Sequence, residues 1–251
     1  MEIESPVADH LFETKVAEFK KSQFDKPVIF GGFVGPGLVG LVTTGYMIEK
    51  LNLHEIAHVV SQHIPPVVVF VGAKLRHPFR IYSDDQGKIL AMICELPIDI
   101  EGLYEISSVL LDWTEQVQAN EMVILDGVPV SGVPQDRKAF GVADETRIKD
   151  LQSKGVEAIP TAMITGIGGA ILNQCLTRRM SGVSLLTPVS VDIPDPGASL
   201  VLIKAINQIY GLNIGTSELE ENVQRLNARL NELAQQYSKL GDQTAEKQFY
   251  G

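Results

Sequence analysis

The sequence predicts an α/β protein built on a mostly parallel β-sheet, and two strand-turn-helix units carry this prediction. Residues 27–33 form a short apolar run rich in β-branched and aromatic side chains. After a glycine-containing turn at 35–37, an apolar-periodic segment continues to Lys50. This order is typical of a strand, a tight turn and a helix. Residues 156–180 repeat it, with a predicted strand within 156–164, a glycine turn at 165–169 and a helix at 170–180. A helix that leaves a strand through a glycine turn folds back over the sheet, which is the opening unit of an α/β domain.

Periodicity and turn residues predict further elements before residue 126. VVVFVGAK at 67–74 is a nearly continuous apolar run, which predicts a central strand covered on both faces. The turn sequence SDDQG at 83–87 predicts an antiparallel pair of strands on either side of it. The other expected elements are short strands at 14–19, 56–61 and 122–125 and an amphipathic helix at 100–118.

The second half of the chain opens with a loop-rich passage at 127–147, which we expect to form functional surface with one short strand at 139–143. Asp144 and Asp195 precede predicted helices and can cap them, and Pro196 suits an early helical position. The remaining expected elements are a helix from Asp144 through 151, one or two strands within 156–164, a helix at 170–180, a strand at 183–189 and a helix at 199–210.

Length and composition allow one large domain with a short appendage. The chain has 251 residues, of which 45% are hydrophobic, enough to bury a full core. Its net charge of −10 argues against a nucleic-acid partner, which would require clustered cations. Cys94 and Cys175 lie in apolar surroundings and are expected to be buried thiols in a reducing cytoplasm. No apolar run approaches the length of a membrane span, so we expect a cytoplasmic protein without a membrane partner.

The first turn matches the dinucleotide motif G-x-G-x-x-G, here Gly35-Pro36-Gly37-Leu38-Val39-Gly40. Such a site also needs an acidic residue at the end of the next strand to bind the ribose. That strand ends in Ser61-Gln62, and Glu55 lies at its beginning. Pro36 also removes a backbone donor. We therefore favour a structural turn without a cofactor; a nucleotide- or nucleoside-binding enzyme that uses the GPGLVG turn is the alternative function.

A second motif, His54-Glu55-Ile56-Ala57-His58, matches the zinc-protease pattern H-E-x-x-H. That pattern requires a helix, which places both histidines on one face. The β-branched residues that follow favour a strand, in which residues four apart are roughly 13 Å distant at about 3.3 Å per residue. We therefore expect no metal site here.

Several acidic residues fall at predicted strand ends or in loops, where α/β enzymes place catalytic acids. They are Glu95, Asp99, Asp126, Asp144, Asp192 and Asp195. Acids at these boundaries also act as caps and turn formers, and no nucleophile elbow or ordered triad accompanies them. The expectation is a protein that is not an enzyme.

Residues 216–240 predict a C-terminal helix. Ser217 and Glu220 form a capping box at its start. Apolar residues then recur at steps of four and three, which is a narrow heptad seam suited to another helix, of the same chain or of a partner. The seam consists of Leu219, Val223, Leu226, Leu230, Leu233, Tyr237 and Leu240. Residues 241–251 are expected to form a flexible tail.

The chain resembles the proteasome assembly chaperone family, in particular archaeal-type homologues of its second chaperone subunit. The resemblance covers about residues 26–211 and depends on four patterns: GGFVGPGLVG at 31–40, Glu95-Leu96-Pro97, Leu125-Asp126-Gly127 and TGIGGAIL at 165–172. It implies a three-layer α/β/α domain similar to nucleoside phosphorylases, without their catalysis. The expected organisation is a chaperone-like domain at 1–215, the helix at 216–240 and the tail at 241–251.

The resemblance also implies a partner. Relatives of this kind carry a C-terminal hydrophobic-Tyr-any-residue tail that docks between neighbouring α subunits of the proteasome core particle. The matching residues here are Phe249, Tyr250 and Gly251. Because a three-residue anchor binds weakly by itself, several tails on one homo-oligomer would raise the avidity. We therefore expect a homo-oligomeric chaperone or activator-like protein that binds the α ring.

Overall fold

A computed structural model describes residues 13–20, 22–132, 134, 137–190 and 195–224. The chain divides into two compact units, Met1–Ile214 and Gly215–Gly251, each of which is described by itself. In the second unit the described residues 217–224 are helical.

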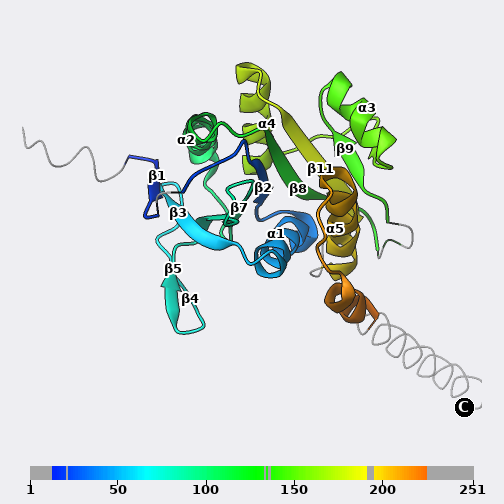
Figure 1. Cartoon of the computed structure of the whole chain (residues 1–251), viewed down its shortest axis with the longest axis horizontal. Helices are drawn as coiled ribbons and strands as arrows, with labels where there is room; N and C mark the ends of the chain where they lie inside the picture. Colours follow the sequence, from blue (N-terminus) through cyan, green and yellow to red (C-terminus); the bar gives the residue numbers. More distant parts are fainter. Residues whose placement is uncertain (1–12, 21, 133, 135–136, 191–194, 225–251) are drawn as a thin grey trace, which may run out of the picture. The chain divides into compact units, whose positions relative to one another are not determined.

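The first unit alternates strands and helices along the chain (Figure 1). The strands are β1 (Lys15–Glu18), β2 (Val28–Gly32), β3 (His54–Val60), β4 (Val69–Val71), β5 (Lys74–Arg76), β6 (Phe79–Ser83), β7 (Ile89–Cys94), β8 (Glu121–Pro129), β9 (Phe140–Val142), β10 (Glu157–Ala158) and β11 (Gly182–Val189). The helices are α1 (Val39–Lys50), α2 (Leu103–Gln116), α3 (Glu145–Ser153), α4 (Gly166–Arg178) and α5 (Pro196–Tyr210), with short 3-10 turns at Pro36–Leu38 and Ile100–Gly102.

Nine of these strands form one sheet in the order β1-β3-β6-β7-β2-β8-β11-β9-β10. Its centre, β7-β2-β8-β11, is parallel throughout. Antiparallel ladders add β6, β3 and β1 on one side and β9 on the other. The carboxyl ends of the four central strands therefore lie at one edge of the sheet.

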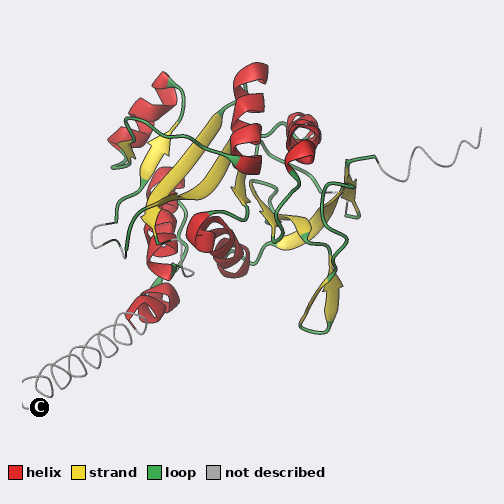
Figure 2. Ribbon diagram, turned by 180° about the vertical axis from the view of Figure 1, so that it is seen from behind, coloured by secondary structure: helices red, strands yellow, loops and turns green. Residues whose placement is uncertain are grey.

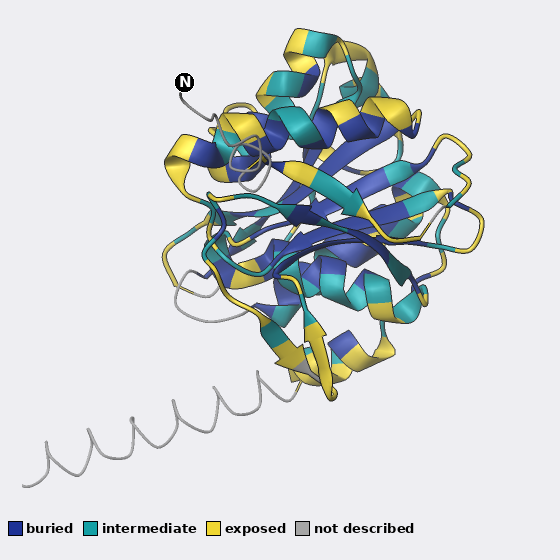
Figure 3. Cartoon of the chain, turned by 90° about the vertical axis from the view of Figure 1, so that its left-hand side faces the viewer, coloured by how far each residue is buried: buried dark blue, intermediate teal, exposed yellow. Residues whose placement is uncertain are grey.

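Helices cover both faces of this sheet. α1 packs with α5 on one face, and α2 packs with α4 on the other (Figures 2 and 3). The larger apolar core lies under α2 and α4 and includes Ile106, Leu110 and Ile171, each fully buried. A smaller cluster under α1 includes Leu53 and Ile93. The predicted α/β class with helices on both faces is confirmed.

Most predicted elements are present. The strands at the start of the chain, the hairpin β6–β7 and the caps of α3 and α5 are as expected: Asp144 accepts hydrogen bonds from the amides of Thr146 and Arg147, and Asp195 accepts one from Ala198. α4 begins at Gly166, four residues earlier than predicted, so the glycines of the predicted turn lie in its first turn. The helix of the second unit starts at Ser217, and the hydroxyl of Thr216 lies 3.2 Å from the Glu220 carboxylate, so the expected cap is displaced by one residue.

One prediction is wrong. Residues 67–74 do not form a central strand covered on both faces. Val69–Val71 pairs only with β5, in a separate two-stranded sheet, and Phe70 is 67% exposed. The reason is the turn at Gly72 and Ala73, both of which have positive φ and fold the chain back after three residues.

A buried ion pair ties α3 and α5 to the amino end of β8. Glu121, at the start of β8, is 5% exposed. Arg147 of α3 donates to both its carboxylate oxygens, at 2.7 and 2.8 Å, and the Tyr210 hydroxyl of α5 donates at 2.5 Å. Burial is the largest cause that raises the pKa of the Tyr210 hydroxyl, and the neighbouring Glu121 charge is the next. The hydroxyl therefore keeps its proton and remains a donor. The carboxylate is therefore compensated by charge and by hydrogen bonds.

We predict that Arg147→Met lowers the free energy of unfolding by about 3 kcal/mol, because it leaves the Glu121 carboxylate buried without a cation. Urea unfolding measures the loss. Lys149→Met is the matched control in the same helix: its exposed pair with Glu145 is worth less than about 1 kcal/mol. Equal losses in the two variants would contradict a special role of the buried pair.

Candidate functional site

The edge where the central strands end is where α/β proteins place ligands. Three features predicted from the sequence meet there: the turn at 35–40, Asp126 of β8 and the turn at 165–169. Phe33, Val34, Asp126 and the start of α4 line a common small cavity of about 90 Å³. Ligand pockets usually measure about 300–1,000 Å³, so this cavity by itself is smaller than a usual ligand pocket.

The glycines of the GPGLVG turn are each explained by packing within the chain. A Cβ on Gly35 would lie 2.6 Å from Oδ1 of Asp126. Gly37 has φ of +60° and would contact Val189 and the carbonyl of Ser190 at 3.0 Å. A Cβ on Gly40 would lie 2.4 Å from the carbonyl oxygen of Leu125. The motif therefore allows close approach between α1, β8 and the end of β11.

Asp126 places a carboxyl group directly beside this turn. Its Oδ1 accepts a hydrogen bond from the amide of Gly127 at 2.8 Å, and burial raises its pKa. When ionised, this carboxylate repels a phosphate from the turn. The geometry thus favours the structural interpretation of G-x-G-x-x-G over the nucleotide-binding alternative.

The H-E-x-x-H residues lie on β3, as the strand prediction requires. His54 faces Asp85, with 3.5 Å between Nδ1 and Oδ1. His58 instead stacks on His77, with ring centroids 3.7 Å apart and an interplanar angle of 4°. Among the residues that the structure describes, no three His, Cys, Asp or Glu side chains form a metal-binding group.

The other predicted acids do not converge on one site. Glu95 pairs with the buried Arg80 at 2.9 Å, and Asp195 pairs with Arg137 at 2.6 Å. Asp144 caps α3. Asp192 lies outside the described residues, and Asp99 is exposed. Three of these carboxylates therefore have identified structural roles.

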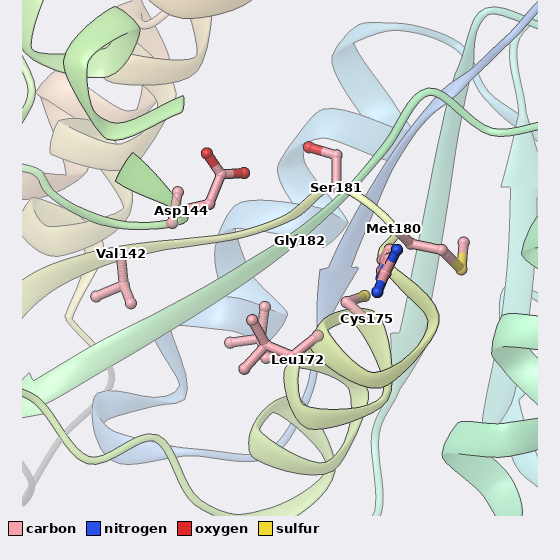
Figure 4. Close-up of a pocket in the computed structure, with 10 residues that line it drawn as sticks. Val142, Asp144, Leu172, Cys175, Met180, Ser181 and Gly182 are labelled. Atoms are coloured by element: carbon pink, nitrogen blue, oxygen red, sulfur yellow. The ribbon is translucent and has the colours of Figure 1, made fainter. Parts of the chain in front are cut away.

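Both cysteines are free and buried, as expected. Burial raises the pKa of each thiol to about 11, so both are protonated at neutral pH and poor nucleophiles. Cys175 borders a cavity of about 540 Å³ between α4 and the loop after β9 (Figure 4). Leu172, Met180 and Val142 give this cavity mainly apolar walls.

A second hollow, which we name the apolar groove, adjoins the small cavity at the carboxyl edge. It measures about 320 Å³. Its walls come from the ends of β2 and β7 and from the starts of α2 and α4: Phe33, Val34, Leu96, Pro97, Ile98, Ile100, Leu103, Gly166 and Ile167. Ile100 is 81% exposed, and the exposed acids Asp99 and Glu101 flank it in sequence. The groove is therefore apolar inside, and we call the two exposed acids that adjoin Ile100 in the sequence its rim.

The hairpin β4–β5 presents a second apolar surface and projects from the main sheet (Figures 1 and 2). Phe70 and Leu75 lie directly opposite each other across its ladder, so their side chains share one face. They are 67% and 71% exposed, and Val68 before β4 is also exposed. We call these three residues the hairpin face.

Sequence patterns missed both surfaces. The signal for the hairpin was Gly72-Ala73 followed by the cations Lys74 and Arg76, which interrupt the apolar run. The signal for the groove was the apolar segment that continues past β7 through Leu96 to Ile98. The predicted tail residues Phe249, Tyr250 and Gly251, and the heptad seam beyond Val223, lie outside the described residues.

Known structures share this arrangement of strands and helices. A protein of unknown function from Thermoplasma acidophilum is 45% identical with a TM-score of 0.75, covering 88% of this chain and 91% of its own. Pyrococcus furiosus PbaA, described as an archaeal homolog of proteasome-assembly chaperone, is 22% identical with a TM-score of 0.79, covering 93% and 97%. Pyrococcus furiosus PbaB, described as an archaeal proteasome activator, is 22% identical with a TM-score of 0.77, covering 88% and 99%.

The fold is that of a three-layer α/β protein in which the glycines of the turn at 35–40 let helix and sheet pack closely. The model of the PAC2 family matches residues 29–234, more than half of the chain, so the chain belongs to the PAC2 family. The predicted family resemblance is confirmed.

Among the described residues, no helix is both long and apolar enough to cross a membrane.

The packing role of the turn predicts that Gly40→Ala destabilises the protein by about 1–3 kcal/mol, because the new Cβ would overlap the carbonyl of Leu125. Gly45→Ala in the same helix is the control. Its Cβ would meet only Ile93, at 4.0 Å, and alanine gains about 0.5–1 kcal/mol over glycine in a helix. Thermal unfolding compares the two, and a Gly40→Ala variant as stable as the parent would refute the packing explanation.

The stacked histidines predict a loss of stability in acid. Burial and then the facing His77 lower the pKa of His58, and Arg80 lies opposite it across the β3–β6 ladder. The unfolded chain therefore binds this proton more readily, and stability falls as the pH drops below about 6.5 towards the lower folded-state pKa. His77→Gln removes the facing charge and should reduce the difference in urea midpoint between about pH 8 and 5.5. An unchanged difference would exclude the His77 charge as a cause.

Proposed function

We propose that this protein is a proteasome assembly chaperone or activator-like protein that acts in the cytoplasm as a homo-oligomer and binds the α ring of the proteasome core particle. The main support for this proposal is that the chain belongs to the PAC2 family. PbaA and PbaB, with the same fold, are described as a homolog of proteasome-assembly chaperone and as a proteasome activator. The proposed role is non-catalytic and requires neither cofactor nor metal.

In this proposal the anchor is the C-terminal Phe249-Tyr250-Gly251. Phe249 can fill an apolar cleft, and the Tyr250 ring adds apolar area while its hydroxyl finds an acceptor. The carboxylate of Gly251 can form a charge-assisted bond with a lysine of the partner. The domain 1–215 would then present the helix 216–240 and the tail 241–251.

Weak individual anchors make the oligomer part of the mechanism. When three residues become ordered on binding, the loss of conformational entropy cancels much of their favourable interaction free energy. Tails held together on one oligomer bind at a high effective concentration, which raises avidity by about 10²–10⁴ where several pockets are reached at once. The proposal therefore requires both the tail and self-association.

We predict that a variant ending at Gln248 binds the isolated α ring at least about tenfold more weakly than the full chain, because the aromatic pair and the carboxylate are lost. Biosensor titration with immobilised α ring measures the affinity. Gln243→Ala, in the same polar segment, is the control and should bind like the parent. Equal affinity of the shortened form would remove the tail from the mechanism.

A thermal-shift titration with nucleotides and nucleosides tests the alternative. A bound ligand raises the melting temperature by mass action. A rise that is abolished by altering the GPGLVG turn would favour the enzyme class over the proposal.

A further inference from the structure

The hairpin face is an apolar surface that nothing covers within the part of the chain that the structure describes. Phe70 and Leu75 are 67% and 71% exposed and directly opposed, and Val67 and Val68 extend the same apolar stretch. An isolated two-stranded hairpin is at best marginally stable in water. Contiguous exposed apolar side chains of this kind mark interaction sites. The hairpin face is therefore a candidate interaction surface.

Both ends of the hairpin are anchored to the main sheet by contacts of the residues that flank it. Ile64 is buried in the main core, and the hydroxyl of Ser61 accepts hydrogen bonds from Thr14 at 2.8 Å and from the amide of His63 at 3.2 Å. At the other end, His77 stacks on His58, and its carbonyl accepts a hydrogen bond from Arg80 at 2.6 Å. This anchoring reduces the conformational entropy that the hairpin loses when it binds.

The apolar groove has room for the apolar side chains of the hairpin face, and its rim carries the opposite charge. Its volume of about 320 Å³ is sufficient for an aromatic and an aliphatic side chain. The hairpin segment 65–77 carries Lys74 and Arg76 and no acid, although the chain has a net charge of −10. The groove rim carries Asp99 and Glu101. In the described ranges, no ion pair involves any of these four side chains.

We propose that the hairpin face of one copy inserts into the apolar groove of a second copy, with Lys74 and Arg76 beside Asp99 and Glu101. Each copy carries both halves of the contact, and both halves are open in the single chain. Burial of Phe70 and Leu75 supplies the affinity, and the opposite charges at the rim set the orientation and speed association. This inference deepens the proposed function, on whose self-association it rests, by assigning the interface.

Sedimentation equilibrium of the full chain tests the interface. The parent should self-associate. Phe70→Asp and Leu75→Asp should each weaken association at least about tenfold, because they place a carboxylate in an apolar, acid-rimmed groove. Ile100→Asp alters the other half of the contact and should do the same. Leu176→Asp, on α4 away from the groove and 76% exposed, is the matched control and should associate like the parent.

Charge reversal makes the test independent of apolar substitutions that could disturb folding. Lys74→Glu and Glu101→Lys should each weaken association, and the double variant should recover most of it, with unchanged circular dichroism throughout. A monomeric parent, or single and double variants that associate equally, would overturn the inference.

The two proposals fail separately. Loss of α-ring binding on deleting the tail, with intact association of the hairpin variants, would leave the proposed function and remove this interface. Dissociation of the hairpin variants, with α-ring binding unaffected by tail deletion, would establish the interface and remove the tail from the mechanism.

Discussion

The close approach of α1 to the sheet is the constraint on which the rest of the structure depends. A Cβ on Gly32 of β2 would lie 2.3 Å from the carbonyl oxygen of Gly40, and a Cβ on Gly40 would lie 2.4 Å from that of Leu125. Only bare backbone permits this distance, so β2, β8 and α1 are locked together at the centre of the fold. The carboxyl ends of the parallel strands then meet, and the loops that follow them build the apolar groove.

Local signals in the sequence predicted elements whose stability depends on near neighbours. The cap residues Asp144 and Asp195 are of this kind, because their hydrogen bonds close within three residues. The strand assignment of His54–His58 was also correct, because β-branched neighbours favour an extended backbone. The dinucleotide motif could not be judged from its pattern alone, because its glycines lie against carbonyl oxygens and side chains that are distant in sequence.

An apolar sequence indicates that a segment tends to be buried, but it does not show whether the same domain or another molecule buries it. The run at 67–74 has the composition of a core strand, yet Phe70 and Leu75 are exposed. A strand buried within its own domain and a strand buried by another molecule have the same composition, so this error has a physical cause. The groove was missed for the converse reason, since its walls come from four elements that become neighbours only through the sheet order.

Charge and apolarity are distributed unequally on this chain, and this distribution connects the fold to its proposed role. A net charge of −10 keeps copies apart through general repulsion, so contact between them needs a local site where the sign is reversed. The hairpin is such a site, because Lys74 and Arg76 flank its apolar residues. In the proposed assembly, each copy contributes one cationic hairpin and one groove with acids at its rim, which makes the association specific. Under the proposed function, a short tail would bind weakly by itself, so the number of tails held together would set the overall affinity for the α ring.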